Sequence, residues 1–214
     1  MTAIFYTAEL SLPEEDFQPF VDWFVGRHCV DLYRSGFYTV ACYKTTEGDQ
    51  QVLDIYQADS WDAFTTEGYA ARGKDPYAKT KLANGFGFAN TVYGYVEGTS
   101  GDPKKIIDSD WLTVFRFNGE DEAVEKLVKE IEGHEIWKSY GSKPLSFRVT
   151  TRKGVKNHPT LVSTRENNCL VIEWDHEPAP LAPIHTVVAE LLGLSEDQVA
   201  RTTGHRLYPW INNI

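Results

Sequence analysis

Residues 4–34, IFYTAELSLPEEDFQPFVDWFVGRHCVDLYR, decide the fold of this chain. Residues 4–10 are rich in β-branched and aromatic side chains, which predicts a strand. Ser11 is followed three residues later by Glu14, with a proline between them, and this pattern is typical of a capping box that opens a helix. Apolar side chains then recur at helical spacing as far as Leu32. The stretch therefore predicts a strand followed by one long amphipathic helix.

The segments that follow extend this unit. Two strand-like patterns, at residues 37–44 and 51–57, are joined by a glycine-containing turn and predict a hairpin. A second helix is expected to begin with Asp59 or Ser60 as its cap. Residues 85–97 read as a further strand, weakened by glycines.

The same order of elements returns after a linker at residues 99–110. The expected elements are a strand at 111–117, a helix from Glu120, strands at 145–152 and 169–174, a helix at 180–192, a short capped helix from Ser195 to Gln198 and a last strand at 206–211. The segment VLDIY at residues 52–56 corresponds to LVIEW at residues 170–174 in the second half. The chain therefore reads as two diverged copies of one βαββα unit, residues 1–98 and 111–214.

Composition and charge exclude several classes of function. The net charge is -10 at pH 7, and no cluster of basic and aromatic residues offsets it, so nucleic acid and membrane surfaces are not expected partners. No apolar stretch approaches the roughly 20 residues that span a bilayer. The 3 cysteines are widely separated, which fits a reducing compartment and no disulfide framework. Together with an N-terminus unlike a signal peptide, these features predict a cytoplasmic protein.

Two short motifs carry a resemblance to a known family. They are WFVGRH at residues 23–28, near the end of the first helix, and LDIY at residues 53–56, on a later strand. A strand, a long helix, a hairpin and a second helix form a ferredoxin-like unit. With the two motifs, this layout resembles the dimeric α+β barrel superfamily, and within it the EthD-like proteins and small monooxygenase and cyclase relatives. The resemblance implies an α+β fold in which two tandem ferredoxin-like repeats pack their antiparallel sheets as an α+β barrel.

The resemblance also implies a pocket between sheet and helices in each half, used on aromatic or polyketide-like small molecules. Many relatives work without a metal or an organic cofactor, so no cofactor is expected. Some tandem relatives, such as the chlorite dismutase group, bind haem through a histidine, but this sequence matches no full haem-ligand motif. Tandem copies could close one barrel within the chain or pair as a homodimer.

Histidines near the ends of the two long helices are the candidate catalytic bases. His28 lies on the apolar stripe of the first helix, and Asp31 follows three residues later. A histidine oriented by a carboxylate can act as a general base near neutral pH. The alternative is a buried structural histidine favoured by the helix dipole. His134 is the counterpart of His28 in the second half and the second candidate.

Strand residues supply possible substrate contacts. If Leu53 and Ile55 pack under the helices, Asp54 and Tyr56 face the barrel interior, and Glu9 is placed by the same rule. Carboxylates that point into an aromatic-lined cavity have raised pKa values and can move protons. The alternative is a solvated sheet face with ordinary cross-strand polar pairs.

The expected function follows from these candidates. Glu9, Trp23, Tyr33, Asp54 and Tyr56 are the expected substrate-binding residues. The histidines form no metal-binding motif, so no metal is expected. We therefore predict a cofactor-independent enzyme that acts on a small hydrophobic or aromatic oxygenated molecule by general acid/base chemistry, of lyase, isomerase, cyclase or monooxygenase type. The alternative is a non-catalytic small-molecule or haem-binding protein of the same fold.

Overall fold

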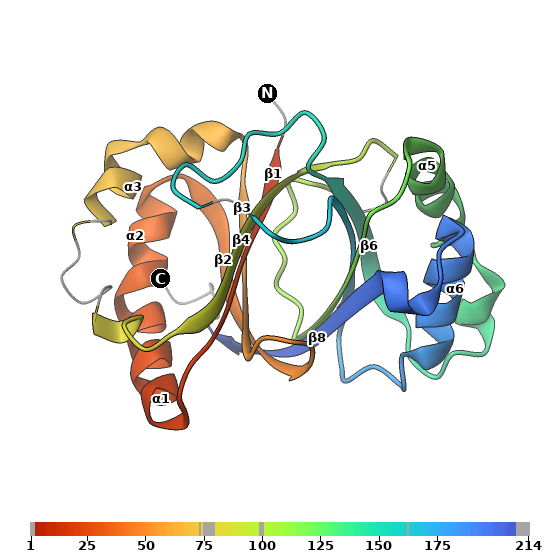
Figure 1. Cartoon of the computed structure of the whole chain (residues 1–214), viewed down its shortest axis with the longest axis horizontal. Helices are drawn as coiled ribbons and strands as arrows, with labels where there is room; N and C mark the ends of the chain where they lie inside the picture. The colour runs from red at the N-terminus through yellow and green to blue at the C-terminus, as the bar shows by residue number, and fades with distance from the viewer. Residues whose placement is uncertain (1–2, 73, 75–79, 99–100, 162, 209–214) are drawn as a thin grey trace.

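The computed structural model describes residues 3–72, 74, 80–98, 101–161 and 163–208. Its helices lie in two groups on opposite sides of a central sheet (Figure 1). In the described residues this sheet has eight strands, all antiparallel to their neighbours, and it closes into a barrel. The chain therefore has the mixed α+β fold expected from its sequence.

The first half supplies four strands and the helices on the left of Figure 1. Its elements are β1 (Ile4–Ser11), α1 (Glu14–Trp23), the π-helical turn Phe24–His28, α2 (Cys29–Arg34), β2 (Phe37–Glu47), β3 (Val52–Ala58), the 3₁₀ helix Trp61–Thr65, α3 (Glu67–Arg72) and β4 (Phe86–Tyr95). α1, the π turn and α2 follow one another directly, which confirms the long helix predicted after the first strand.

The second half supplies four strands and the helices on the right of Figure 1. Its elements are β5 (Trp111–Phe117), α5 (Asp121–Glu130), the 3₁₀ helix Glu135–Lys138, β6 (Pro144–Thr151), β7 (Asn168–Trp174), α6 (Ala182–Leu192), the 3₁₀ helix Glu196–Gln198 and β8 (Val199–Tyr208). The last strand begins earlier than predicted, because residues 199–205 already pair with β5. The predicted continuation to residue 211 lies outside the described residues.

Two of the predicted helix caps form and one does not. Ser195 and Gln198 make the reciprocal bonds of a capping box, and Ser60 accepts a hydrogen bond from the backbone of its helix. At the start of α1, Pro13 stands at the N-cap without a side-chain bond. Ser11 is still part of β1, so its hydroxyl accepts from the backbone N–H of Gln51 in the adjacent turn instead.

The strands follow the order β1-β3-β2-β8-β5-β7-β6-β4 around the barrel. The first half therefore has the order β4-β1-β3-β2, and the second half the equivalent order β8-β5-β7-β6. β2 joins β8 from Cys42↔Tyr208 to Glu47↔Thr203, whereas β4 joins β6 only at Gly94↔Thr151 and Tyr95↔Thr150. The halves thus meet edge to edge, at a long β2–β8 seam and a short β4–β6 seam. The sheets of the two halves therefore close into one barrel within the chain, which is one of the two arrangements expected for tandem copies.

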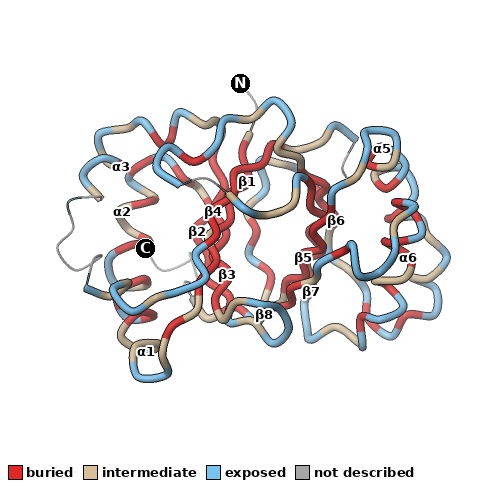
Figure 2. Tube along the Cα trace, viewed as in Figure 1, coloured by how far each residue is buried: buried red, intermediate tan, exposed pale blue. Residues whose placement is uncertain are grey.

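The pleat of β3 places its side chains opposite to the prediction. Leu53 and Ile55 join the apolar cluster inside the barrel, while Tyr56 belongs to the cluster under the helices. Asp54 alternates with them and shares the helix-facing side with Tyr56. The prediction that Asp54 and Tyr56 face the barrel interior is therefore wrong. All residues of β3 are buried (Figure 2), so the pattern of apolar residues does not show which side of the strand faces the helices.

Buried ion pairs share the barrel interior with this apolar cluster. The Glu9 carboxylate accepts hydrogen bonds from Arg116 at 2.8 Å and from Arg165 at 2.6 Å. Glu173 accepts from the Arg148 guanidinium at 2.8 Å. Charges removed from water need such paired geometry, because an unpaired buried charge is strongly destabilising. Glu9 thus faces the interior as predicted, but it is part of the structural core there.

The segment between the halves packs into one end of the barrel. Ile107 is fully buried in the interior cluster, and its N–H donates to the Gln57 side chain at 2.9 Å. The Tyr43 hydroxyl donates to the Ser109 carbonyl at 2.9 Å. Residues 101–110 of the predicted linker are therefore a packed segment, and residues 99–100 lie outside the described part.

None of the helices in the described ranges combines the length and the apolar character that crossing a bilayer requires.

Candidate functional site

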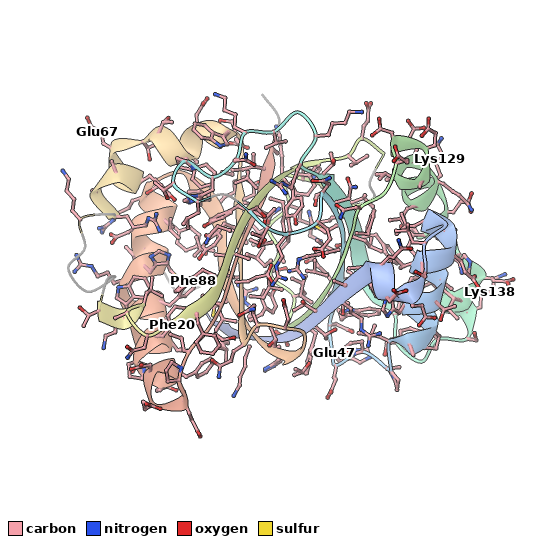
Figure 3. All side chains as sticks on the ribbon, in the orientation of Figure 1. Phe20, Glu47, Glu67, Phe88, Lys129 and Lys138 are labelled. Atoms are coloured by element: carbon pink, nitrogen blue, oxygen red, sulfur yellow. The ribbon has the colours of Figure 1, made fainter. Side chains whose placement is uncertain are left out.

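A cavity of about 270 Å³ lies in the first half, between its helices and its strands. Its walls come from α1 and the π turn on one side and from β1, β3 and β4 on the other. Phe20 and Phe88 lie in the space between helix and sheet on the left of Figure 3. The aromatic wall is made by Tyr6, Phe20, Trp23, Phe24, Tyr56 and Phe88. This lining suits a flat apolar ligand.

His28 reaches the cavity from the π turn. Such turns are rare widenings of a helix and occur frequently at functional sites. The imidazole packs beside Trp23, with ring centroids 4.6 Å apart, and beside Phe24 at 5.3 Å. His28 is only 7% exposed and lines the cavity, as its position on the apolar stripe predicted.

Asp54 places a buried carboxyl group in the cavity wall. It is 3% exposed, and this burial raises its pKa to about 7, because the charged form loses its hydration. The Tyr56 hydroxyl donates to Asp54 Oδ2 at 3.2 Å, and this bond and one from the Cys42 thiol lower the pKa in part. Asp54 Oδ1 is buried and accepts no hydrogen bond within the described residues. A carboxyl group of this pKa can take up and release a proton near neutral pH.

Tyr6 and Tyr56 form a stacked pair beside this carboxyl group. They are direct neighbours across β1 and β3, and their ring centroids are 4.8 Å apart. The Tyr6 hydroxyl donates to the Asn90 side chain on β4. Burial raises the pKa values of both phenols, so both remain protonated hydrogen-bond donors at neutral pH.

His158 comes to this site from the second half, on the loop between β6 and β7. Its ring stacks on Tyr6 with centroids 5.3 Å apart. Its Nδ1 accepts from the Thr160 backbone at 3.3 Å, which assigns the proton to Nε2 and makes Nε2 the donor to the Tyr69 hydroxyl at 2.8 Å. Burial, reinforced by the Arg72 charge, lowers the pKa of His158 to about 4, so it is neutral at pH 7. The second half thereby covers the cavity of the first.

Four predicted residues meet at the cavity. His28, Trp23, Asp54 and Tyr56 all line it. Glu9 contributes to the same wall, but its carboxylate binds the interior arginines on the other face of the sheet. The structure thus brings together the two motifs at residues 23–28 and 53–56, which the sequence placed far apart.

Three predicted residues lie elsewhere. Asp31 is half-exposed, with its carboxylate 3.9 Å from the Arg27 guanidinium, and it is not among the described residues that line the cavity. The Tyr33 hydroxyl donates to the Val40 carbonyl at 3.3 Å. In the second half, His134 Nδ1 accepts from the Ile136 backbone at 3.2 Å, which caps a 3₁₀ helix. The geometry expected for Asp31 as the orienter of His28 is therefore not the one observed.

Sequence reasoning missed several cavity residues, among them the polar side chains of Tyr6, Arg72, Asn90 and His158. Tyr6 and Asn90 become neighbours of Asp54 only through the pairing of β1 with β3 and β4. Alternation along residues 4–10 could have placed Tyr6 on the face of Ala8. No local pattern marks His158 or Arg72, because each reaches the cavity from an element that is remote in sequence.

Comparison with known proteins gives likeness in structure alone. No family model matches the sequence, and no curated protein matches it. An anthrone oxidase-like protein aligns with a TM-score of 0.57 and 11% identity, over 97% of this chain and 92% of that chain. A haem-binding protein from Thermus thermophilus aligns at 0.52 and 10%, over 97% and 92%. A chlorite dismutase from Candidatus Nitrospira defluvii aligns at 0.51 and 12%, over 96% and 91%.

These likenesses span nearly the whole chain, so they show that it shares its α+β barrel fold with these structures. At 10 to 12% identity they show the fold and not the chemistry. The activity has to be argued from the residues of the cavity.

The cavity is small for a haem, although two histidines, His28 and His158, line it. Its volume of about 270 Å³ lies below the roughly 300–1,000 Å³ of pockets that hold drug-sized ligands, and a haem is larger than most of these. Both ring nitrogens of His158 already have hydrogen-bond partners. In the second half, Trp137 and Trp174 fill the space beneath the helices. Within the described ranges, no group of three or more potential metal ligands occurs.

Proposed function

We propose that the protein is an enzyme that abstracts a proton from a small aromatic oxygenated molecule, with the Asp54 carboxylate as the general base and without a tightly bound cofactor. The observation that carries this proposal is the buried Asp54 carboxyl group in an aromatic cavity, with a pKa raised to about 7 by burial. A base with this pKa combines a populated charged form with a strong tendency to take up a proton.

The proposed reaction begins with transfer of an acidic C–H or O–H proton of the substrate to Asp54. The electron pair that is left on the substrate forms an enolate or phenolate, whose oxygen can accept a hydrogen bond from the Asn90 amide. If the proton returns to another atom of the substrate, the result is an isomerisation, and if a leaving group departs, the result is an elimination. Closure of a ring gives a cyclisation, and reaction of the anion with dioxygen gives an oxygenation. The anthrone oxidase-like structure has the same fold, which is compatible with the last outcome.

His28 has a different part in this proposal from the one that the sequence suggested. It lines the same cavity as Asp54, so it is placed to exchange a proton with the substrate or to bind it. Asp31 is not required for this. His134 lies in the second half at a helix cap, so we propose one working site per chain, in the first half.

The organisation predicted from sequence belongs to the same proposal. We infer two ferredoxin-like repeats, residues 1–98 and 111–214, related to the EthD-like proteins and acting in the cytoplasm on a small-molecule substrate. The equal strand order of the two halves supports the repeat. The barrel closes within one chain, so the proposed site does not depend on a homodimer.

Hydrogen–deuterium exchange into aromatic ketones tests the proposed proton abstraction directly. Anthrone and 2-tetralone carry acidic C–H bonds, and their exchange in D₂O can be followed by ¹H NMR. We expect the protein to accelerate exchange of at least one of them, with a rate that rises with pH through about 7 as Asp54 loses its proton. Asp54→Asn should lower the rate about 10²- to 10⁴-fold.

Two further variants make this test specific. Tyr56→Phe removes a hydrogen bond to the Asp54 carboxylate, so the midpoint of the pH profile should move upward. Asp62→Asn makes the same chemical change at an exposed carboxylate and should leave the rate unaltered. An Asp54→Asn protein that is folded and as active as the wild type would refute the role of Asp54.

A further inference from the structure

Arg72, at the end of α3, brings a positive charge to the wall of the cavity. Its guanidinium lies 4.2 Å from the centroid of the Tyr69 ring. Such stacking on an aromatic face holds the planar guanidinium in place while leaving its N–H groups at the edge. Arg72 Nε is buried and has no hydrogen-bond partner within the described part of the chain.

Three other arginines differ from Arg72 in having carboxylate partners, although the Nε atoms of Arg116 and Arg165 also lack a hydrogen-bond partner among the described residues. Arg116 and Arg165 bind the Glu9 carboxylate, and Arg148 binds Glu173, at N–O distances of 2.6 to 2.8 Å. Within the described ranges, Arg72 forms no ion pair with a carboxylate. In a chain with a net charge of -10, carboxylates are abundant, so the lack of such a partner for Arg72 among the described residues stands out.

The aromatic groups beside the Arg72 guanidinium do not balance its charge. Tyr69, beneath the guanidinium, has a pKa raised by burial and stays neutral. The nearby His158 is neutral at pH 7, and Tyr6 is a protonated phenol. The charge of Arg72 therefore acts on the cavity itself, where a bound anion would complete the hydrogen bonding of the guanidinium.

We propose that Arg72 is the anion-binding residue of the cavity and that the ligand is a planar aromatic carboxylate. A guanidinium binds a carboxylate through two parallel N–H···O bonds, which a neutral ring substituent cannot reproduce. The aromatic wall would hold the ring, with Trp23 and Phe88 from opposite sides of the cavity. This inference deepens the proposed function because it names the substrate class, but the binding it describes does not require turnover.

Calorimetric binding of two matched probes tests the charge recognition. The probes are 2-naphthoate and its neutral analogue 2-naphthamide, which have the same ring and nearly the same shape. We expect wild-type protein to bind 2-naphthoate at least 10-fold more tightly than 2-naphthamide. Arg72→Gln should weaken 2-naphthoate binding about 10- to 100-fold and remove the preference, while changing 2-naphthamide binding little.

Lys74→Gln is the matched control, because it removes one positive charge from an exposed position close in sequence. It should leave the binding of both probes unchanged. Equal affinities of wild-type protein for the two probes, no binding of 2-naphthoate, or a preference that survives in Arg72→Gln would each overturn the proposal.

Asp54→Asn separates this inference from the proposed reaction. It should bind 2-naphthoate at least as tightly as wild type, because a negative charge has been removed, and yet be inactive in the exchange assay. A wild-type protein that accelerates exchange but shows no preference for 2-naphthoate would refute the anion site alone. Intact exchange in Asp54→Asn with the naphthoate preference retained would refute the base alone.

Discussion

The two halves of the barrel have the same strand order, but the first has an aromatic cavity beneath its helices and the second has a packed apolar cluster there. The difference can be traced to matching positions on β3 and β7. Asp54 and Tyr56 face the helices of the first half, and Ile172 and Trp174 occupy the matching positions of the second. A carboxyl group and a phenol thus stand where the other half has two large apolar side chains.

Trp174 shows how the second half uses this position. It is fully buried, packs against Trp137 and Tyr140, and donates through Nε1 to the Thr113 hydroxyl at 3.0 Å. The second half is therefore a packed core that supports the barrel, whereas the first half keeps a space and a buried titratable group. In our proposal, the second half contributes stability and the first half contributes the site.

Removing the Trp174 side chain should have the largest effect on stability. Trp174→Ala opens a cavity in a close-packed core and should reduce the free energy of unfolding by about 3–5 kcal/mol. Chemical denaturation would measure this loss. Tyr56→Phe in the first half should cost less than about 1.5 kcal/mol, because only one hydrogen bond is removed. Equal losses in the two variants would contradict the division between a supporting half and a functional half.

Asp54→Asn should stabilise the protein above neutral pH. The pKa of Asp54 is raised from 3.8 to about 7 on folding, so the folded state holds a proton that the unfolded chain has lost between these pH values. The contribution of Asp54 to stability therefore falls as the pH rises from about 4 to about 7 and stays low above it. With about 1.4 kcal/mol for each pKa unit, the gain in Asp54→Asn at pH 8 is at most about 4 kcal/mol.

Denaturation curves of wild type and Asp54→Asn at pH 4 and pH 8 would check this sign. The difference in the free energy of unfolding should be small at pH 4 and should favour the variant at pH 8. A wild type that is the more stable protein at pH 8 would show that the folded protein favours the charged carboxylate, contrary to the proposal.

Protonation of His158 should lower the free energy of unfolding at acid pH, by a smaller amount than the effect of Asp54. Its pKa is lowered from 6.5 to about 4 on folding, so the unfolded chain binds a proton that the folded protein does not. This stabilising contribution is present above pH 6.5 and is lost as the pH falls towards 4, over a range of at most about 3 kcal/mol. In His158→Gln, the free energy of unfolding should fall less steeply as the pH is lowered below about 6.5. An unchanged curve in His158→Gln would refute this role.

The helices and strands of this fold were predicted better from the sequence than the side of the sheet on which each strand residue lies. The long helix with His28 on its apolar stripe is confirmed, because amphipathic periodicity is a local property. The side on which Asp54 lies was predicted wrongly, since the barrel interior is as apolar as the layer under the helices. Closure into one barrel is set by the pairing of β2 with β8 and of β4 with β6, and no local pattern encodes these contacts.

The site shows the same limit. Trp23, His28, Asp54 and Tyr56 could be selected by residue type and motif, and they do meet at one cavity. His158 could not be selected in this way, because its position depends on a loop of the second half folding over the first. Asp31 lies beside Arg27 and is not among the described residues that line the cavity, so its orienting role stays a prediction.

The short β4–β6 seam has a consequence for motion. Strand pairing across it is confined to residues 94–95 of β4, and loop contacts continue it, such as the bond between the Thr91 and Ser163 hydroxyls. Segments held by few backbone hydrogen bonds have the lowest free energy of local opening. Fluctuations of the native barrel should therefore begin here, where β4 carries Phe88 and Asn90 and the neighbouring loop carries His158. Transient parting of this seam would open the cavity to solvent while the long β2–β8 seam keeps the barrel intact.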